Sequence, residues 1–217
     1  MMRLENVTYR YQNNNKAVLN DVSCTFEAGC LSAVTGPSGS GKTTLLSLIA
    51  GMDKPIEGDL FIDGESLQDL DLDRYRRERV SMIFQSFHLF PLLQAIENVC
   101  FPMELIGMNK TLARLRAENL LKSVGIGPDM FRRHPSNLSG GEQQRVAIAR
   151  SLASGARLLL ADEPTGNLDM ANTQNIMGIL SRLAHDNGFC IIFVTHDMDA
   201  AAAADVVYKM RDGVLSR

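Results

Sequence analysis

The sequence predicts an α/β domain with a mostly parallel sheet and an inserted α-helical lobe. β-rich and helical segments alternate up to residue 85 and again from residue 155, whereas helical patterns dominate between them. A glycine-rich loop at Gly36–Thr43 also joins a β-rich run to a helical run, which is the order found in parallel sheets. We therefore expect a single domain over residues 1–217, with a core lobe of residues 1–85 plus 155–217 and a helical lobe over about residues 86–154.

The first part of the chain is expected to supply strands and one helix. Arg3–Tyr11 and Val18–Glu27 alternate between polar and apolar residues, so they predict an antiparallel β subdomain at the N-terminus. The run that leads into Gly36 predicts a strand, and the helical run after the loop stops at Gly51. Two more strands are expected, at Gly58–Gly64 and Val80–Gln85.

The rest of the chain divides into a helical part and a second α/β part. Three segments between residues 95 and 154 have helical character: "AIENVCFPMELIG", "LARLRAENLLKSVG" and "GEQQRVAIARSLA". The order then returns to a strand in "ARLLLADEP", a helix over Asn172–His185 and a strand in "FCIIFVTH". The alanine run Ala200–Asp205 is expected to be helical, and strands are expected in "VVYKM" and "GVLSR".

Composition limits the partners and the location. The residues are 45% hydrophobic and 22% charged, which allows a sizeable core. The net charge of −3 gives no support for nucleic-acid binding, and the arginines at 74, 76, 77 and 79 are interpreted as a solvated helix face. No apolar run approaches the ~20 residues needed to span a bilayer, the N-terminus has no signal-peptide pattern, and the cysteines form no C-x-x-C pair. We expect a cytoplasmic protein with reduced thiols and no nucleic-acid partner.

The segment "GPSGSGKT" matches the phosphate-loop pattern G-x-x-x-x-G-K-[ST] completely. Its glycines allow successive backbone N–H groups to hold the β-phosphate of a nucleotide. Lys42 is predicted to reach the β- and γ-phosphates, and the Thr43 hydroxyl is predicted to bind Mg²⁺. The predicted nucleotide-binding residues here are Gly36, Pro37, Ser38, Gly39, Ser40, Gly41, Lys42, Thr43 and Thr44.

Polar residues at the ends of later strands complete the predicted catalytic group, together with Lys42. Asp162 and Glu163 follow an apolar strand, and we expect Asp162 to bind Mg²⁺ and Glu163 to polarise the attacking water. His196 ends the next strand, where it is expected to hydrogen-bond the γ-phosphate. Gln85 ends "VSMIFQ", and its amide oxygen is expected to bind Mg²⁺ or to hydrogen-bond the attacking water. The other histidines, His88, His134 and His185, are interpreted as structural.

A second helix start suited to an anion occurs in "NLSGGEQQR". Ser139 and two glycines stand directly before Glu142, at the beginning of a helical run. A single chain with one nucleotide has no use for two phosphate sites, so this segment needs its own explanation.

Taken together, these motifs resemble the ATP-binding subunit of ABC transporters over essentially the whole chain. "LSGGEQQRVAIARSL" is similar to the family's signature segment, "ADEPTGNLD" to its second nucleotide motif and "THD" to its switch histidine. The resemblance implies a P-loop NTPase (RecA-like) core, ATP with Mg²⁺, and a head-to-tail dimer with two ATP sites at its interface. Each site would receive five residues from the other copy: Ser139, Gly140, Gly141, Glu142 and Asp169.

The resemblance also implies that an aromatic residue near the N-terminus stacks on adenine. Tyr11 is at the matching position. Tyr9 is the alternative, because strand alternation would place it on the same face.

Within the family, "IFQSFHLFPLLQAIENV" and "EPTGNLD" resemble the branch of lipoprotein-releasing, macrolide-exporting, cell-division and peptide-resistance ATPases. The branch implies an ATPase on the inner face of the cell membrane, held there by a permease that contacts the region Gln85–Val99. A non-transport ABC ATPase is the less favoured reading, since the helical lobe is short and the chain holds one cassette. The same ATPase driving a sensing or force-transmitting envelope complex remains an open alternative.

Overall fold

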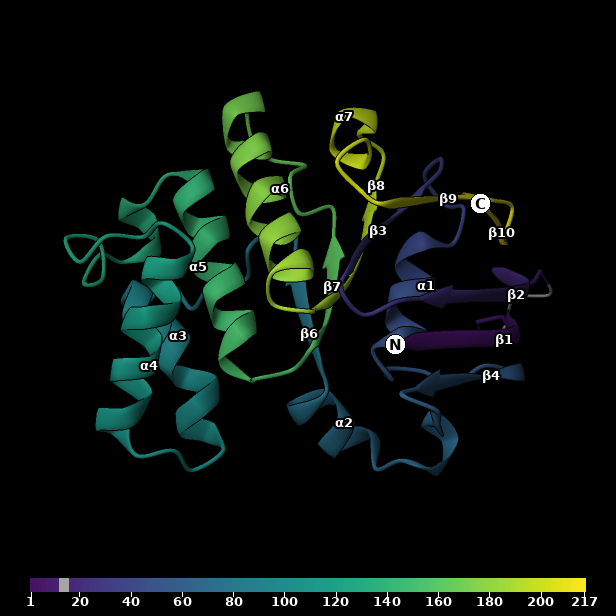
Figure 1. Cartoon of the computed structure of the whole chain (residues 1–217), viewed down its shortest axis with the longest axis horizontal. Helices are drawn as coiled ribbons and strands as arrows, with labels where there is room; N and C mark the ends of the chain where they lie inside the picture. Colours follow the sequence, from purple (N-terminus) through teal and green to yellow (C-terminus); the bar gives the residue numbers. More distant parts are fainter. Residues whose placement is uncertain (12–15) are drawn as a thin grey trace.

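The computed structural model describes residues 1–11 and 16–217, which form two sheets and two groups of helices (Figure 1). The first sheet has the strand order β2-β1-β4-β5, and its neighbouring strands are all antiparallel. The expected antiparallel subdomain is therefore confirmed. Its strands are β1 Met2–Tyr9, β2 Leu19–Phe26, β4 Glu57–Ile62 and β5 Glu65–Ser66.

The second sheet has the order β10-β9-β3-β8-β7-β6, and all its strands are parallel except the edge strand β10. Its strands are β3 Cys30–Thr35, β6 Val80–Phe84, β7 Leu158–Asp162, β8 Cys190–Thr195, β9 Val206–Arg211 and β10 Val214–Ser216. The carboxyl ends of parallel strands share one edge of a sheet, so the loops after β3, β6, β7 and β8 meet at that edge.

The helices divide between the core and a separate lobe, as the sequence predicts. The core has α1 Lys42–Ile49, α2 Leu72–Glu78, α6 Met170–His185 and α7 Met198–Ala201, with a 3₁₀ turn η1 Leu67–Asp69. The lobe has α3 Ala95–Leu105, α4 Lys110–Ser123 and α5 Gly140–Ala153, with a 3₁₀ turn η2 Pro135–Asn137. Figure 1 shows α3, α4 and α5 at one end, the antiparallel sheet at the other and the parallel sheet between them. None of the helices described is both long and apolar enough to cross a bilayer.

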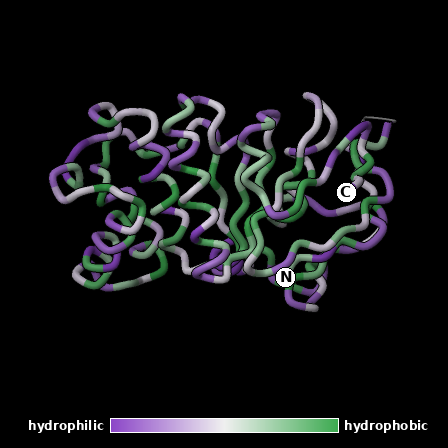
Figure 2. The backbone as a smooth tube through the Cα atoms, turned by 45° about the horizontal axis from the view of Figure 1, so that its top comes forward, coloured by the Kyte–Doolittle hydropathy of each residue, from purple (hydrophilic) through white to green (hydrophobic). Residues whose placement is uncertain are grey.

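Apolar side chains form two buried clusters, one on each face of the parallel sheet. Along β8, Ile192 belongs to one cluster and Phe193 to the other, because successive strand residues point to opposite faces. The first cluster packs α1 between the two sheets. The second joins α6 to the helical lobe, for example through Ile176 and Val146. Figure 2 shows these apolar segments gathered in the interior. The helical lobe thus shares its core with the sheet.

The prediction for the alanine run is wrong beyond its second residue. Helix α7 ends at Ala201, and the chain then turns before β9 begins at Val206. Asp205 explains the stop: its N–H donates to the carbonyl of Leu31 at 2.8 Å, and its carboxylate accepts from the N–H of Leu31 at 2.8 Å. These bonds to β3 bring the chain into the sheet, and this tertiary contact overrides the helix propensity of alanine.

Candidate nucleotide-binding site

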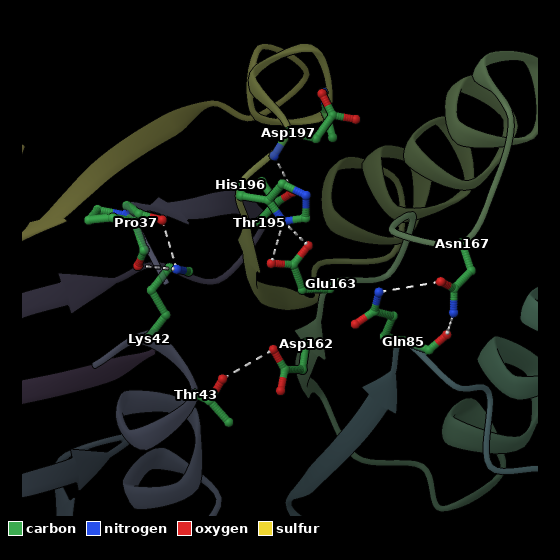
Figure 3. A network of polar contacts seen from close by, with 12 residues as sticks. Pro37, Lys42, Thr43, Gln85, Asp162, Glu163, Asn167, Thr195, His196 and Asp197 are labelled. Atoms are coloured by element: carbon green, nitrogen blue, oxygen red, sulfur yellow. Dashed lines mark hydrogen bonds and ion pairs between the residues drawn. The ribbon is translucent and has the colours of Figure 1, made fainter. Parts of the chain in front are cut away.

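Most of the predicted site residues of the core lobe line one cleft of about 860 Å³ at the carboxyl edge of the parallel sheet, whereas Gly36, Pro37, Ser40 and Asp169 do not. The lining residues come from five segments that are far apart in the sequence, and Figure 3 shows the polar contacts among them. The residues that line the cleft are Tyr11, Val18, Ser38, Gly39, Gly41, Lys42, Thr43, Thr44, Gln85, Asp162, Glu163 and His196.

The phosphate loop has a backbone that only glycine can adopt at two positions. Gly36 has φ of 155°, and a Cβ there would lie 2.1 Å from the carbonyl oxygen of Met210. Gly41 has φ of 109°, and a Cβ there would lie 2.8 Å from the carbonyl oxygen of Val18. Gly41 is also the N-cap of α1 and has no side chain to cap it. The N–H groups at this helix start are therefore available to an anion.

Two polar side chains of the loop have unused hydrogen-bonding capacity. The ammonium group of Lys42, only 8% exposed, donates to the carbonyl oxygens of Gly36 at 2.8 Å and Pro37 at 2.9 Å. An ammonium has three donors, so one remains. The buried hydroxyl of Ser40 has no hydrogen-bond partner among the described residues. A loop with spare donors around a helix start fits a phosphate group.

Asp162 and Thr43 bring together two oxygen ligands of the kind that Mg²⁺ prefers. Asp162 ends β7, and the Thr43 hydroxyl donates to its Oδ1 at 3.5 Å. Burial raises the pKa of the Asp162 carboxyl, and the neighbouring Glu163 raises it further, while the Thr43 hydrogen bond and the Lys42 charge act in the opposite direction. A bound divalent cation would favour the ionised carboxylate, so the donor set fits Mg²⁺.

Glu163 and His196 form a direct pair. Nδ1 of His196 lies 2.7 Å from Oε1 of Glu163. The Glu163 side chain is 18% exposed and that of His196 is 69% exposed. Glu163 has φ of 50°, and its N–H donates to the carbonyl of Val194 at 3.0 Å, so the backbone is held in a strained conformation at this point. In Figure 3, Glu163 and Asp162 lie between the phosphate loop and Gln85.

Gln85 lines the cleft, but its side chain is engaged with the loop that follows Glu163. Its Nε2 donates to Oδ1 of Asn167 at 3.4 Å, and Nδ2 of Asn167 donates to the carbonyl of Gln85 at 3.2 Å. A Cβ on Gly166 would lie 2.7 Å from this amide, so glycine allows the close packing. The contribution of Gln85 to a metal or water therefore stays a prediction.

The two candidate tyrosines differ in burial. The Tyr11 ring is 49% exposed, lines the cleft, and its hydroxyl lies 2.9 Å from Oγ1 of Thr44. Tyr9 is 5% exposed and its hydroxyl bonds to Asp53, with the ring meeting the edge of Tyr11 at a centroid distance of 5.1 Å. The β1 strand ends at Tyr9, so simple alternation does not extend to Tyr11. Of the two, Tyr11 has the ring surface that can stack on a base.

The residues predicted to act in trans do not line this cleft. Ser139 caps α5 in a reciprocal capping box: its hydroxyl accepts from the N–H of Glu142 at 3.3 Å, and its N–H donates to Oε2 of Glu142 at 2.7 Å. The backbone hydrogen bond lowers the pKa of the Glu142 carboxyl. Gly140 follows at the same helix start, and the exposed Asp169 caps α6.

Two polar residues near the site, Asn172 and Gln144, were not identified from the sequence. Asn172 lies over Gly141, where a Cβ would be 2.1 Å from its Oδ1, and its Nδ2 also donates to Asp169. Gln144 is fully buried on α5. The three-residue spacing from Asp169 to Asn172 is a capping signal that could have been used. Gln144 gives no comparable signal, since its contact is distant in sequence.

Comparisons with known proteins agree with this architecture. The sequence model of the family described as ABC transporter matches residues 19–166. The macrolide export ATP-binding/permease protein MacB of Shewanella sp. (strain W3-18-1) is 42% identical over 211 residues, covering 96% of this chain and 32% of that protein. The chain therefore spans about a third of the length of this relative. An uncharacterised ABC transporter ATP-binding protein of Methanocaldococcus jannaschii is 39% identical over 225 residues, covering 100% of this chain and 96% of that protein.

Solved structures show the same fold over the whole chain. A dimeric ATP-binding cassette in a post-hydrolysis state with ADP and Pi aligns with a TM-score of 0.88 and 38% identity, covering 100% of this chain and 97% of that one. The structure of cbiO1 from Clostridium perfringens aligns with a TM-score of 0.91 and 28% identity, covering 100% and 86%. The chain belongs to the ABC transporter family, as an ATP-hydrolysing cassette similar to those of the macrolide-export branch.

Proposed function

We propose that the chain is the ATP-hydrolysing subunit of a bacterial ABC transporter that powers a membrane partner in the export or extraction of a substrate such as a lipoprotein, peptide or drug. Two copies would close head to tail around two ATP molecules. The observation that carries this proposal is the position of Ser139–Glu142: a helix start suited to phosphate that lies outside the chain's own phosphate cleft.

Within one chain, the cleft residues have separate tasks. The phosphate loop and Lys42 bind the β- and γ-phosphates, and the exposed Tyr11 ring stacks on adenine. Thr43 and Asp162 would hold Mg²⁺, with Gln85 as a further ligand; the bound ion neutralises charge on the phosphates. Glu163 polarises the attacking water. His196 orients the Glu163 carboxylate through the 2.7 Å contact, and its exposed ring reaches the γ-phosphate.

Closure would depend on the triphosphate. The γ-phosphate would bridge Lys42 and His196 of one copy to the Ser139 helix start of the other, with Asp169 beside it. ADP lacks this bridging group, so the closed state has a higher affinity for ATP, and hydrolysis favours opening. The solved cassette with ADP and Pi is a dimer, which supports the dimeric arrangement. The helical lobe over about residues 86–154 would move against the core lobe during closure.

The Glu163→Gln substitution tests the scheme. Removing the carboxylate that polarises water should lower turnover by on the order of 10²–10⁴-fold while leaving ATP binding intact. This variant is therefore expected to elute as a dimer from a sizing column with saturating ATP and Mg²⁺, and as a monomer without nucleotide.

The control is the double variant Lys42→Ala and Glu163→Gln. It lacks the ammonium that holds the phosphates, so it should elute as a monomer under both conditions. Monomeric elution of Glu163→Gln itself with ATP and Mg²⁺ would contradict the proposed dimer.

A groove between the two lobes is the proposed contact surface for a membrane partner. It has a volume of about 360 Å³, and its lining from α2, β6, α3 and α5 is mostly apolar but includes Arg76, Arg77 and Arg150. Its exposed apolar residues include Phe90, Phe101, Leu105 and Ile106. Of the segment Gln85–Val99, only Phe90 lines the groove, so we extend the proposed permease contact to the end of α3. The relative MacB is named an ATP-binding/permease protein, which agrees with a membrane partner for this chain. Such a partner would hold the cassette on the inner face of the membrane.

A further inference from the structure

Gln144 is a buried polar residue that the proposed reaction does not use. It lies on α5 with no exposed surface, and its Nε2 donates to the carbonyl oxygen of Pro164 at 2.6 Å. Its Oε1 is also buried and has no hydrogen-bond partner among the described residues. A buried amide with an unpaired acceptor is less favourable than an apolar side chain of the same shape. The bond to Pro164 therefore calls for an explanation other than stability.

Pro164 follows Glu163 directly, in a loop that is also bonded to Gln85 through Asn167. The loop is closed by two backbone hydrogen bonds, from Gly166 to the carbonyl of Glu163 at 3.1 Å and from Leu168 to the carbonyl of Thr165 at 3.0 Å. Glu163 itself has the strained φ of 50°. The Pro164 carbonyl belongs to the peptide between Pro164 and Thr165, so the bond from Gln144 fixes the loop one residue beyond Glu163. Gln144 thus restricts the backbone that carries Glu163, while His196 contacts the carboxylate itself.

Ser139 lies five residues before Gln144, exposed at the start of the same helix, and the first turn of this helix packs on the same loop. A Cβ on Gly140 would lie 3.5 Å from Leu168, and Gly141 lies under Asn172, which holds Asp169. In Figure 1, α5 runs beside α6, which follows this loop. The start of α5 and the loop over residues 163–169 are therefore packed together, so a displacement of the helix start is passed to the loop.

We infer that Gln144 is a positioning residue that links the two ATP sites of the dimer. The inference rests on the proposed head-to-tail dimer. In this dimer, Ser139 at the start of α5 binds the ATP in the partner's cleft. The same helix carries Gln144, which bonds the Pro164 carbonyl next to Glu163 in the cleft of its own copy. Occupancy of one site thereby orients the carboxylate that polarises water in the other. The nucleotide at each site acts as an effector of the opposite site.

The test is Gln144→Met, which keeps the side-chain length and removes both the bond to Pro164 and the unpaired acceptor. We expect kcat to fall by on the order of ten- to a hundredfold, because the carboxylate is misplaced, with KM for ATP within about twofold of the wild type. We expect a Hill coefficient for ATP above one in the wild type and a coefficient of about one in this variant. Tm should hold or rise.

Ser151→Ala is the matched control. Ser151 is also buried on α5, but its hydroxyl donates to Ile148 within the helix, away from the loop. This variant should keep kcat and the Hill coefficient. A lowered Tm in Gln144→Met with an unchanged kcat would show a purely structural role and overturn the inference.

A second measurement separates the inference from the proposed dimer. Glu163→Gln and the double variant Glu163→Gln with Gln144→Met are compared on the sizing column with ATP and Mg²⁺. If both variants elute as dimers, the result supports a role for Gln144 in orienting the Glu163 carboxylate without a role in closure. A dimer of the single variant only would place Gln144 in closure and overturn the inference. Monomers of both would contradict the proposed dimer instead.

Hydrogen exchange tests the inference even if the Met side chain does not fit the space that Gln144 occupies. In the apo protein, Gln144→Met and Gln144→Leu should both exchange faster over residues 163–169 and be unchanged over the rest of α5. Exchange at the wild-type rate over residues 163–169 in a folded variant would overturn the inference.

Discussion

At the scale of single residues, the cleft is built at a cost in stability. Asp162 and Glu163 are adjacent carboxyl groups, and burial followed by the charge of Glu163 raises the pKa of Asp162. A raised pKa means that the folded state disfavours the ionised form. The stabilising contribution of the protonated carboxyl is complete below its unfolded pKa and is lost as pH rises through the folded value. Near pH 7 the nucleotide-free fold therefore carries an unfavourable charge.

Asp162→Asn should stabilise the protein and inactivate it. The amide keeps the shape of the side chain and removes the charge, so Tm without nucleotide is expected to rise near pH 7. Each kcal/mol gained corresponds to roughly 2–4 °C in a chain of this size. The gain should shrink as pH falls toward 4, while Mg²⁺-dependent hydrolysis is lost.

Differential scanning fluorimetry across this pH range, beside an ATPase assay, measures both effects. The exposed Asp186 supplies a control, and Asp186→Asn should shift Tm by no more than about 1 °C at any pH. An equal Tm for Asp162→Asn and the wild type near pH 7 would contradict the assigned cause of the pKa shift.

At the scale of elements, one polar cluster ties the end of α6 to the sheet. Nε2 of His185 lies 2.9 Å from Oδ2 of Asp205, and the same carboxylate accepts from the N–H of Leu31 on β3. Burial acts to raise the pKa of Asp205, but the Leu31 N–H and His185 lower it overall. A lowered pKa contributes stability above the unfolded value of the pKa, and this is lost as pH falls through the folded value.

Asp205→Ala should therefore lower stability without changing nucleotide affinity. The lost hydrogen bonds are worth about 1 kcal/mol at this exposed position, or roughly 2–4 °C in Tm. Thermal unfolding near pH 7 measures the loss, and KM for ATP should stay unchanged because the cluster does not line the cleft. Asp186→Ala, at the same end of α6, should leave Tm nearly unchanged. A Tm equal to the wild type for Asp205→Ala would exclude this tie.

The same cluster shows what the sequence can predict. The strands, the phosphate loop and the positions of Asp162, Glu163 and His196 follow from local patterns, since a parallel sheet brings strand ends together wherever they fall in the chain. The end of α7 does not, because Asp205 bonds to Leu31, far away in sequence. For the same reason the contact between Gln144 and Pro164 has no local signal. The burial of Tyr9 could not be predicted from a local pattern either, because its hydrogen-bond partner Asp53 is also far away in sequence.

At the scale of the whole molecule, the groove between the lobes is lined by residues of both the core lobe and the helical lobe. Ser81 shows how tightly they meet: its hydroxyl donates to the carbonyl of Ser151 at 2.8 Å and lies 2.7 Å from the hydroxyl of Ser154. These contacts join β6 to α5 along the edge of the groove. A partner seated there would touch both lobes and sense any change in their relative position.

Leu105→Asp should separate partner binding from ATP chemistry. Leu105 is 71% exposed and lines the groove, so a charge there should abolish co-purification with the proposed membrane partner. ATPase activity of the isolated cassette should stay within about twofold, since surface substitutions rarely disturb a fold.

Leu112→Asp is the matched control, because Leu112 is 60% exposed on α4 and does not line the groove. It should co-purify like the wild type. Retained co-purification of Leu105→Asp would rule out the groove as the docking site.

The central place of β3 also has a consequence for biosynthesis. This strand begins at Cys30, but its two neighbours begin at Cys190 and Val206. During translation, the phosphate loop therefore emerges long before the strands that flank it, and Gly36 cannot reach Met210 until β9 has been made. A nascent chain has the antiparallel subdomain early, yet no finished nucleotide site. The phosphate loop is thus completed only after β8 and β9 have been synthesised, and a nascent chain that lacks these strands cannot compete with folded copies for nucleotide.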